Sequence, residues 1–99
     1  MTAQNFATHL SEDRRLIILR LLAEMATYAS NSSVLLLALQ AHGHAITRDQ
    51  IKTELHWLAE QGLVTNTEYG STLVTTLTER GLDAAAGTAV VPGVKRPGA

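Results

Sequence analysis

The chain has 99 residues, a formal net charge of −1, 45% hydrophobic residues and no cysteine. These values are typical of one ordinary globular domain, and no window approaches the ~18 consecutive apolar residues of a membrane span. The missing cysteine excludes disulfides and thiol chemistry and fits the cytoplasm, where we expect the protein to reside. Because the net charge is near neutral, any binding of nucleic acid must depend on where the individual charges lie.

Residues 1–10 predict a short polar N-terminal arm, with no basic residue before the first apolar stretch and hence no signal peptide. Ser11 is a candidate N-cap, and Glu12 and Asp13 place negative charge in the first turn, so we expect a helix to about Tyr28.

This first helix is apolar over far more than the ~100° stripe that a surface helix needs. One explanation is a central helix surrounded by its own domain. The other, which we favour because a domain this small has little material to wrap a helix, is packing against a second subunit. The residues expected at such a dimer interface are Leu16, Ile17, Leu21, Met25 and Tyr28.

Ala29–Ser33 is a polar break with several candidate caps, and Val34 to about His42 predicts a second helix that Gly43 ends. His42 and His44 flank this glycine and could chelate a metal, but no third ligand type is near. We therefore expect loop histidines and no metal site.

The clearest local signal follows, because Thr47 and Gln50 have the spacing of a capping box, with Ile46 and Ile51 as a hydrophobic staple. The helix is expected over residues 48–61 and Gly62 closes it. Its apolar stripe comprises Ile51, Leu55, Leu58 and Ala59.

Residues 63–67 and 71–77 predict two strands joined by the turn Glu68-Tyr69-Gly70. Thr78 caps a last helix, expected over residues 79–86, and residues 88–99 are read as a flexible basic tail. The prediction is one domain over residues 11–87, mainly α with a small β-hairpin, in the order α-α-α-β-β-α.

This order is that of a winged helix-turn-helix, whose third helix enters the DNA major groove. The leading hypothesis is a homodimeric, sequence-specific DNA-binding transcription regulator with double-stranded DNA as partner. The residues expected to face DNA are Thr47, Arg48, Lys52, Thr53 and His56. A solvated face on which Arg48 and Lys52 balance Asp49, Glu54 and Glu60 stays open as the alternative.

Trp57 points away from the apolar stripe on a helical wheel. It can pack on the hairpin or the second helix, lie in a dimer or partner interface, or contact DNA, in that order of expectation. The wing tip has no lysine or arginine, so only Tyr69 and Ser71 are expected to touch a DNA backbone there. The alternative function is therefore a protein-protein interaction module that uses Trp57 and the wing without binding DNA.

An enzyme is not expected. The sequence has no glycine-rich phosphate loop and no Ser-His-Asp or Cys-His constellation, and nothing in it predicts a cofactor. His56 and Glu60, four residues apart on one helix face, are read as a surface pair.

Two segments, Leu55–Val64 and Leu77–Leu82, resemble the helix–wing–helix part of MarR-, PadR- and ArsR-type winged-helix regulators. The whole chain resembles small proteins of Mu-like phages and prophages that are labelled ArsR- or ArdK-like transcriptional regulators. The resemblance implies a bacterial or phage setting, DNA as ligand, and dimerisation. The metal-sensing cysteines of many ArsR-type proteins are missing, and the wing without cations departs from the pattern of a strong DNA binder.

Overall fold

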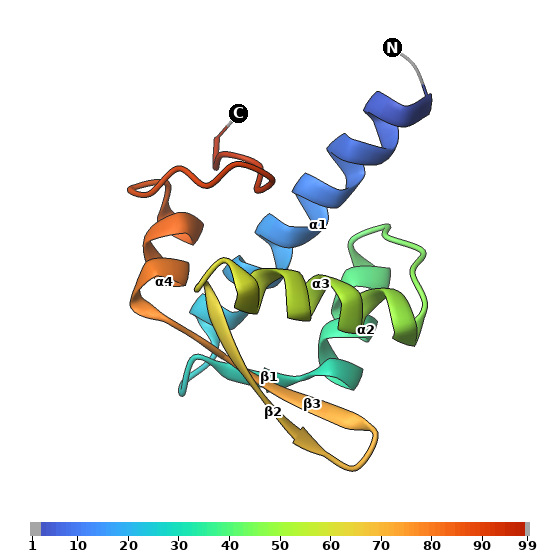
Figure 1. Cartoon of the computed structure of the whole chain (residues 1–99), viewed down its shortest axis with the longest axis vertical. Coiled ribbons are helices and arrows are strands. Elements are labelled where there is room, and N and C mark those ends of the chain that lie inside the picture. Colours follow the sequence, from blue (N-terminus) through green and yellow to red (C-terminus); the bar gives the residue numbers. More distant parts are fainter. Residues whose placement is uncertain (1–2, 99) are drawn as a thin grey trace.

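The computed structural model describes residues 3–98, with side chains from residue 5 onward. It is mainly α-helical with a small antiparallel sheet, as the sequence predicts, and has the winged-helix architecture (Figure 1). The elements in chain order are α1 (Ala3–Glu24), β1 (Ala29–Asn31), α2 (Ser32–Ala41), α3 (Arg48–Glu60), β2 (Val64–Tyr69), β3 (Thr72–Leu77) and α4 (Glu79–Ala86). No helix of the described part is long and apolar enough to cross a membrane.

The first helix differs from its expected bounds at both ends. It begins at Ala3 instead of Ser11, so the predicted arm is helical from that residue, and residues 1–2 lie outside the described part. The sequence has no proline or glycine before the packed part of α1, so the helix extends outward at little cost once it is nucleated. It ends at Glu24, and Tyr28 adopts a left-handed backbone with φ of 57°.

A short strand was not expected in the polar break. β1 pairs antiparallel with β3, which lies in the middle of the sheet order β1-β3-β2. Its three residues are all polar or small and show no alternation of apolar and polar side chains, so β1 is a strand only because it pairs with β3. Asn31 then caps α2 through Oδ1, which accepts from the Val34 amide at 2.9 Å, so α2 starts two residues earlier than expected.

The core contains side chains from α1, α2 and α3. Its buried members on these helices are Leu16, Ile18, Leu19 and Leu22 of α1, Leu35 and Leu39 of α2, and Ile51, Leu55 and Leu58 of α3. Over this stretch α1 is thus the central helix of its own domain.

The local signals around α3 are confirmed. Thr47 Oγ1 accepts from the Gln50 amide and Gln50 Oε1 accepts from the Thr47 amide, while Ile46 and Ile51 are both buried. This end of α3 is therefore held by its own sequence. At the other end the helix stops at Glu60, one residue earlier than expected.

The segment after α4 is not the free tail that the sequence predicts. Val91 and Val94 are buried, and the Lys95 amide donates to the Glu12 carbonyl at 3.2 Å. Two valines three residues apart bury enough apolar surface to hold this segment against α1. Figure 1 shows it above α4 and beside α1.

Candidate nucleic-acid interface

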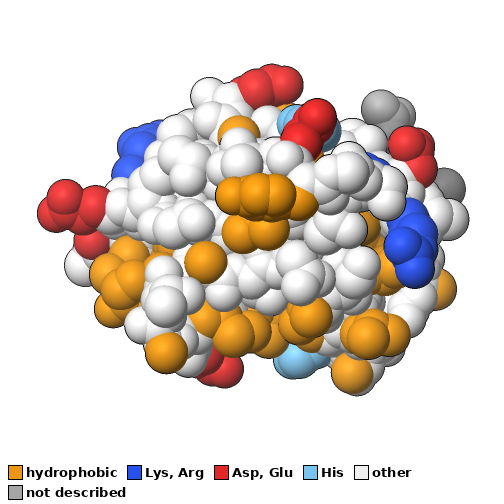
Figure 2. Space-filling model, turned by 90° about the horizontal axis from the view of Figure 1, so that it is seen from below, with side chains coloured by type: hydrophobic (Ala, Val, Ile, Leu, Met, Phe, Trp, Pro, Cys, Tyr) orange, Lys and Arg blue, Asp and Glu red, His pale blue; other side chains and the backbone are white. Residues whose placement is uncertain are grey.

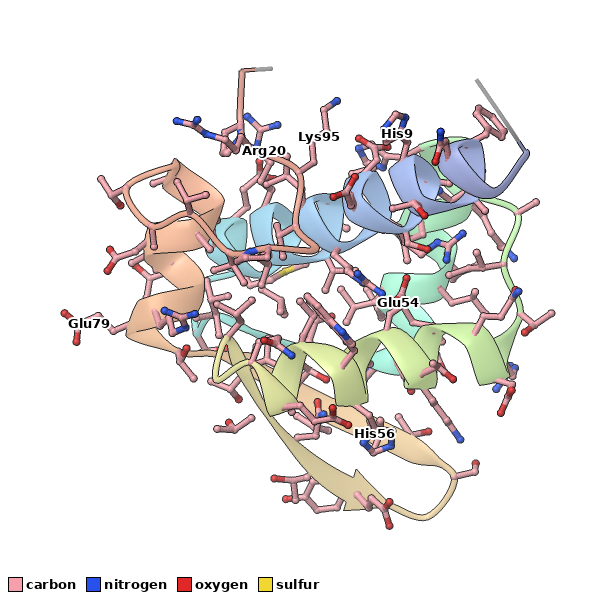
Figure 3. The ribbon with its side chains drawn as sticks, turned by 45° about the horizontal axis from the view of Figure 1, so that its top comes forward. His9, Arg20, Glu54, His56, Glu79 and Lys95 are labelled. Carbon is pink, nitrogen blue, oxygen red and sulfur yellow. The ribbon has the colours of Figure 1, made fainter. Side chains whose placement is uncertain are left out.

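The outward face of α3 carries the predicted DNA-binding residues. Thr47, Arg48, Thr53 and His56 are exposed and Lys52 is half-buried. Figure 3 shows His56 projecting from the side of α3 that faces away from α1 and toward the wing. Arg48 and Lys52 line one hollow together with Ser71 of the hairpin, so these two cations also lie beside the wing.

The two threonines of this set differ in what they can offer a ligand. Thr47 Oγ1 accepts from the Gln50 amide, which leaves its hydroxyl proton to donate outward. The Thr53 hydroxyl donates instead to the Asp49 carbonyl at 3.1 Å. Thr53 is thus the weaker candidate for a phosphate donor, because binding would require it to give up this bond.

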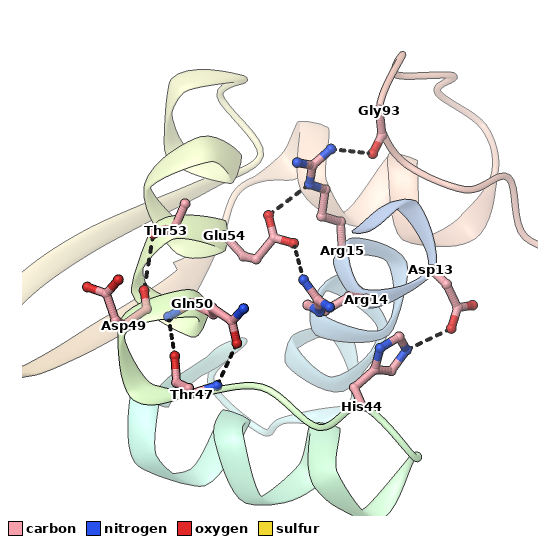
Figure 4. Close-up of polar contacts among 10 residues, drawn as sticks. All are labelled: Asp13, Arg14, Arg15, His44, Thr47, Asp49, Gln50, Thr53, Glu54 and Gly93. Atoms are coloured by element: carbon pink, nitrogen blue, oxygen red, sulfur yellow. Dashed lines mark hydrogen bonds and ion pairs between the residues drawn. The ribbon is translucent and has the colours of Figure 1, made fainter. Parts of the chain in front are cut away.

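Glu54 does not belong to the solvated face. It is 4% exposed and lies between Arg14 and Arg15 of α1, with ion-pair distances of 3.1 Å to Arg14 and 3.0 Å to Arg15 (Figure 4). The spacing of Ile51, Glu54, Leu55 and Leu58 is that of a buried helical stripe, and this signal could have placed Glu54 inside. Arg48 and Lys52 therefore share their surface with fewer carboxylates than the sequence count indicates.

Trp57 packs against the core and is also covered by α1 and the C-terminal segment, which were not among its expected neighbours. The Arg15 guanidinium lies 3.9 Å from the centre of its ring, and Gly93 of the C-terminal segment lies against its six-membered ring. The Arg15 Nη1 also donates to the Gly93 carbonyl at 2.9 Å. The ring is half-buried in this contact because two segments distant in sequence cover it.

The wing meets α3 through a polar contact that sequence reasoning missed. The Thr75 hydroxyl donates to Asn66 Oδ1 at 2.7 Å, and Asn66 Nδ2 donates to the Leu55 carbonyl at 3.0 Å. Because Thr75 is fully buried, this chain of hydrogen bonds fixes the hairpin against the helix. At the wing tip, Tyr69 and Ser71 are exposed.

The remaining cations lie mostly elsewhere. Arg80 Nε donates to the Gln61 carbonyl, and Lys95 forms an ion pair with Asp13 at 3.5 Å. Figure 3 shows Arg20 and Lys95 on the side of the molecule opposite His56. Lys95 of the C-terminal segment is therefore on a different face of the molecule from His56.

The two histidines near Gly43 have structural partners. His44 is buried, and its Nε2 lies 2.9 Å from Asp13 Oδ2, while His42 Nδ1 lies 2.8 Å from the Ala38 carbonyl. Burial raises the pKa of Asp13, but the hydrogen bond from His44 and the charge of Lys95 outweigh burial and hold this pKa below its usual value. Among the described residues no group of three or more potential metal ligands is found.

The residues expected at a dimer interface divide between core and surface. Leu16 is 3% exposed and belongs to the core, so we correct that assignment. Ile17, Leu21 and Met25 are half-buried and Tyr28 is exposed. Sequence reasoning did not select Leu37 of α2, which is 67% exposed although it is leucine. Figure 2, which views the molecule from below Figure 1, shows hydrophobic side chains in a broken band across the lower half of the picture.

Comparison with known proteins gives both a family and a fold. No family model matches the chain. The uncharacterized protein gp26 of Escherichia phage Mu is 50% identical over 88 residues, which cover 89% of this chain and 91% of gp26. An uncharacterized protein of Haemophilus influenzae is 44% identical over 61 residues, which cover 62% of this chain and 59% of that protein.

Among solved structures, the chain is similar to RosR of H. salinarum, with a TM-score of 0.64 and 25% identity. This match covers 74% of the chain and 66% of RosR, so the chain spans just under two thirds of that protein. A RosR-S4 complex matches with a TM-score of 0.62 and 26% identity over 73% of this chain and 62% of the other. These matches bear out the winged-helix class, and the ArsR- or ArdK-like label stays a prediction. The extent and identity of the match to the Mu protein place the chain in one family, and it belongs to the family of phage Mu gp26.

Proposed function

We propose that the chain is a DNA-binding transcription regulator that acts as a homodimer and inserts the outward face of α3 into the major groove. The likeness to the solved structures of RosR supports the winged-helix regulator class. DNA as ligand, sequence specificity and the dimer are the further steps of this proposal.

The observation that carries the proposal is the inward orientation of Glu54. This carboxylate is neutralised by Arg14 and Arg15 within the domain, while Arg48 and Lys52 form no ion pair with any described residue. Two cations that have no ion-pair partner among the described residues, one helical turn apart, suit phosphate oxygens or a guanine edge.

The coverage of the Trp57 ring weakens the alternative function, a protein-binding module. That hypothesis relies on Trp57 as an exposed aromatic anchor, and the ring is instead covered by Arg15 and Gly93. Tyr69 stays exposed on the wing, but a single aromatic side chain is an ordinary surface feature.

For the dimer, we infer an interface built from exposed or half-buried apolar residues of α1 and α2. Leu37 and Val34 of α2 are 67% and 43% exposed, and Leu21 and Ile17 of α1 are half-buried. A twofold dimer would place two α3 helices ~34 Å apart, matching successive turns of a pseudo-palindromic site.

The test is a fluorescence-anisotropy titration against duplex fragments from the DNA flanking the gene of this chain, repeated at several salt concentrations. We expect Arg48→Ala and Lys52→Ala to weaken binding and lower its salt dependence, with circular dichroism unchanged. Arg96→Ala is the matched control, because Arg96 is also exposed and is the sequence neighbour of Lys95, which Figure 3 shows on the side of the molecule opposite His56. Absent binding at low salt, or binding that neither α3 substitution affects, would refute the proposal.

A further inference from the structure

A small hollow lies at the point where α2, α3 and the wing meet. It is lined by Ser32, Ser33, Arg48, Ile51, Lys52 and Ser71. The Leu73 amide donates to Ser32 Oγ at 3.1 Å, which ties the start of α2 to β3. The position of Ser32 relative to the wing is therefore set by this hydrogen bond.

The lining has the chemistry of an anion site. Its lining residues include two cations and three serines, and none of them carries a carboxylate. Asp49 is next to Arg48 in sequence but is exposed and does not line the hollow. The Ser32 hydroxyl accepts from Leu73, so its own proton can be donated.

The size of the hollow restricts what can enter. Its volume of about 10 Å³ is close to that of one water-sized group. A whole phosphate does not fit, but one non-bridging oxygen does, with the other oxygens outside. A phosphate that inserts only one oxygen is held best when contacts to other parts of the same molecule fix its position. This is the case for a phosphate within a DNA strand.

We propose that this hollow seats one non-bridging oxygen of a DNA backbone phosphate, with Lys52 as the counter-charge and the Ser33 and Ser71 hydroxyls as donors. This inference rests on the proposed function and adds to it which side chain contacts the DNA backbone. Lys52 supplies from α3 the cation that the wing lacks, so it binds the backbone without reading sequence. Arg48 lines the same hollow, whereas His56 does not and remains free for base edges.

The test compares Lys52→Gln, Ser33→Ala and Ser71→Ala with the control Arg96→Gln, using the full chain and a duplex that the wild type binds. We expect Lys52→Gln to reduce the slope of log K against log salt by about 0.9, the value for one phosphate contact. Each serine substitution should weaken binding roughly fivefold without changing the slope, because it removes a neutral donor. Arg96→Gln should leave both quantities unchanged.

A Lys52→Gln variant that behaves like Arg96→Gln, while the wild type binds DNA, overturns the phosphate site and leaves the proposed function intact. A wild type that binds no DNA overturns the proposed function. A titration with inorganic phosphate, followed by the amide NMR signals of Ser33 and Ser71, separates the two sources of phosphate. Saturable shifts without any DNA binding would identify a free-phosphate site and overturn the assignment to DNA.

Discussion

The Arg15 guanidinium lies 3.9 Å from the centre of the Trp57 ring, and the same side chain donates to Glu54 and to the Gly93 carbonyl. One arginine of α1 therefore contacts α3 twice and the C-terminal segment once. Because Trp57 and Glu54 belong to the helix that we expect to meet DNA, these contacts set how that helix is held on the domain.

Gly93→Ala tests the contact between the C-terminal segment and Trp57. A Cβ at this position would lie 2.6 Å from Trp57 Cζ2, and φ is +93°. We expect the free energy of unfolding in urea to fall by about 2–3 kcal/mol, combining backbone strain with overpacking. Gly43→Ala is the control, since Gly43 has a φ of +91° but a Cβ added there would meet nothing within 4 Å, so its loss should be about 1 kcal/mol. Equal losses of unfolding free energy in the two variants would mean that the C-terminal segment does not pack against the Trp57 ring.

Glu54→Gln tests the buried ion pairs. The substitution leaves Arg14 and Arg15, whose side chains are 16% and 17% exposed, without a counter-charge. Breaking a mostly buried pair in this way should cost about 3 kcal/mol of unfolding free energy in urea. Glu60→Gln changes the same group on the exposed face of α3 and should stay within about 0.5 kcal/mol of the wild type. A similar small effect for Glu54→Gln would contradict the ion-pair assignment.

The lowered pKa of Asp13 predicts a pH dependence of stability. Its folded pKa lies below the ordinary value of 3.8, so the unfolded state takes up a proton first as the pH falls. The stabilisation by Asp13 is thus present above the unfolded pKa and is lost as the pH falls through the folded pKa. Thermal melts from about pH 5 to about pH 3 should show a steeper loss of stability for the wild type than for Asp13→Asn. If stability falls with pH equally in the wild type and in Asp13→Asn, the contacts of Asp13 with His44 and Lys95 do not stabilise the fold.

Asn66→Ala tests how the wing is held on α3. It removes the acceptor of the buried Thr75 hydroxyl and the donor to the Leu55 carbonyl. We expect a loss of about 1–3 kcal/mol in thermal or urea unfolding, because a buried hydroxyl is left unsatisfied. Thr67→Ala is the control on the same strand, where the side chain is exposed. If both variants melt alike, Asn66 does not join the wing to the helix.

Leu37→Ser tests the proposed dimer. Sedimentation equilibrium at tens of micromolar should give a dimer for the wild type and a shift toward monomer for the variant, since a polar side chain would replace an apolar contact. Tyr69→Ser is the control, because Tyr69 is 65% exposed on the wing, away from the proposed interface. A monomeric wild type would contradict the dimer itself, and a dimeric Leu37→Ser variant would contradict this choice of interface.

Features carried by residues close together in sequence could be predicted. The Thr47–Gln50 capping box, the Thr78 cap of α4 and the hairpin after Gly62 each depend on contacts between neighbours or on periodicity. These local signals predicted the order of the elements and the face of α3 that points outward. They could do so because the hydrogen bonds of a helix cap or a turn join residues only a few positions apart.

Only the tertiary structure decided which element covers each face. Glu54 meets Arg14 and Arg15 across 40 and 39 positions, and the Gly93 carbonyl accepts from Arg15 across 78. A periodic pattern shows that a side chain faces inward or outward, but not what lies opposite. For this reason the sequence left a solvated position for Glu54 open and gave the hairpin or the second helix as the first expected cover of Trp57. Instead, the packing of α1 and the C-terminal segment on α3 neutralises the carboxylate and covers the ring.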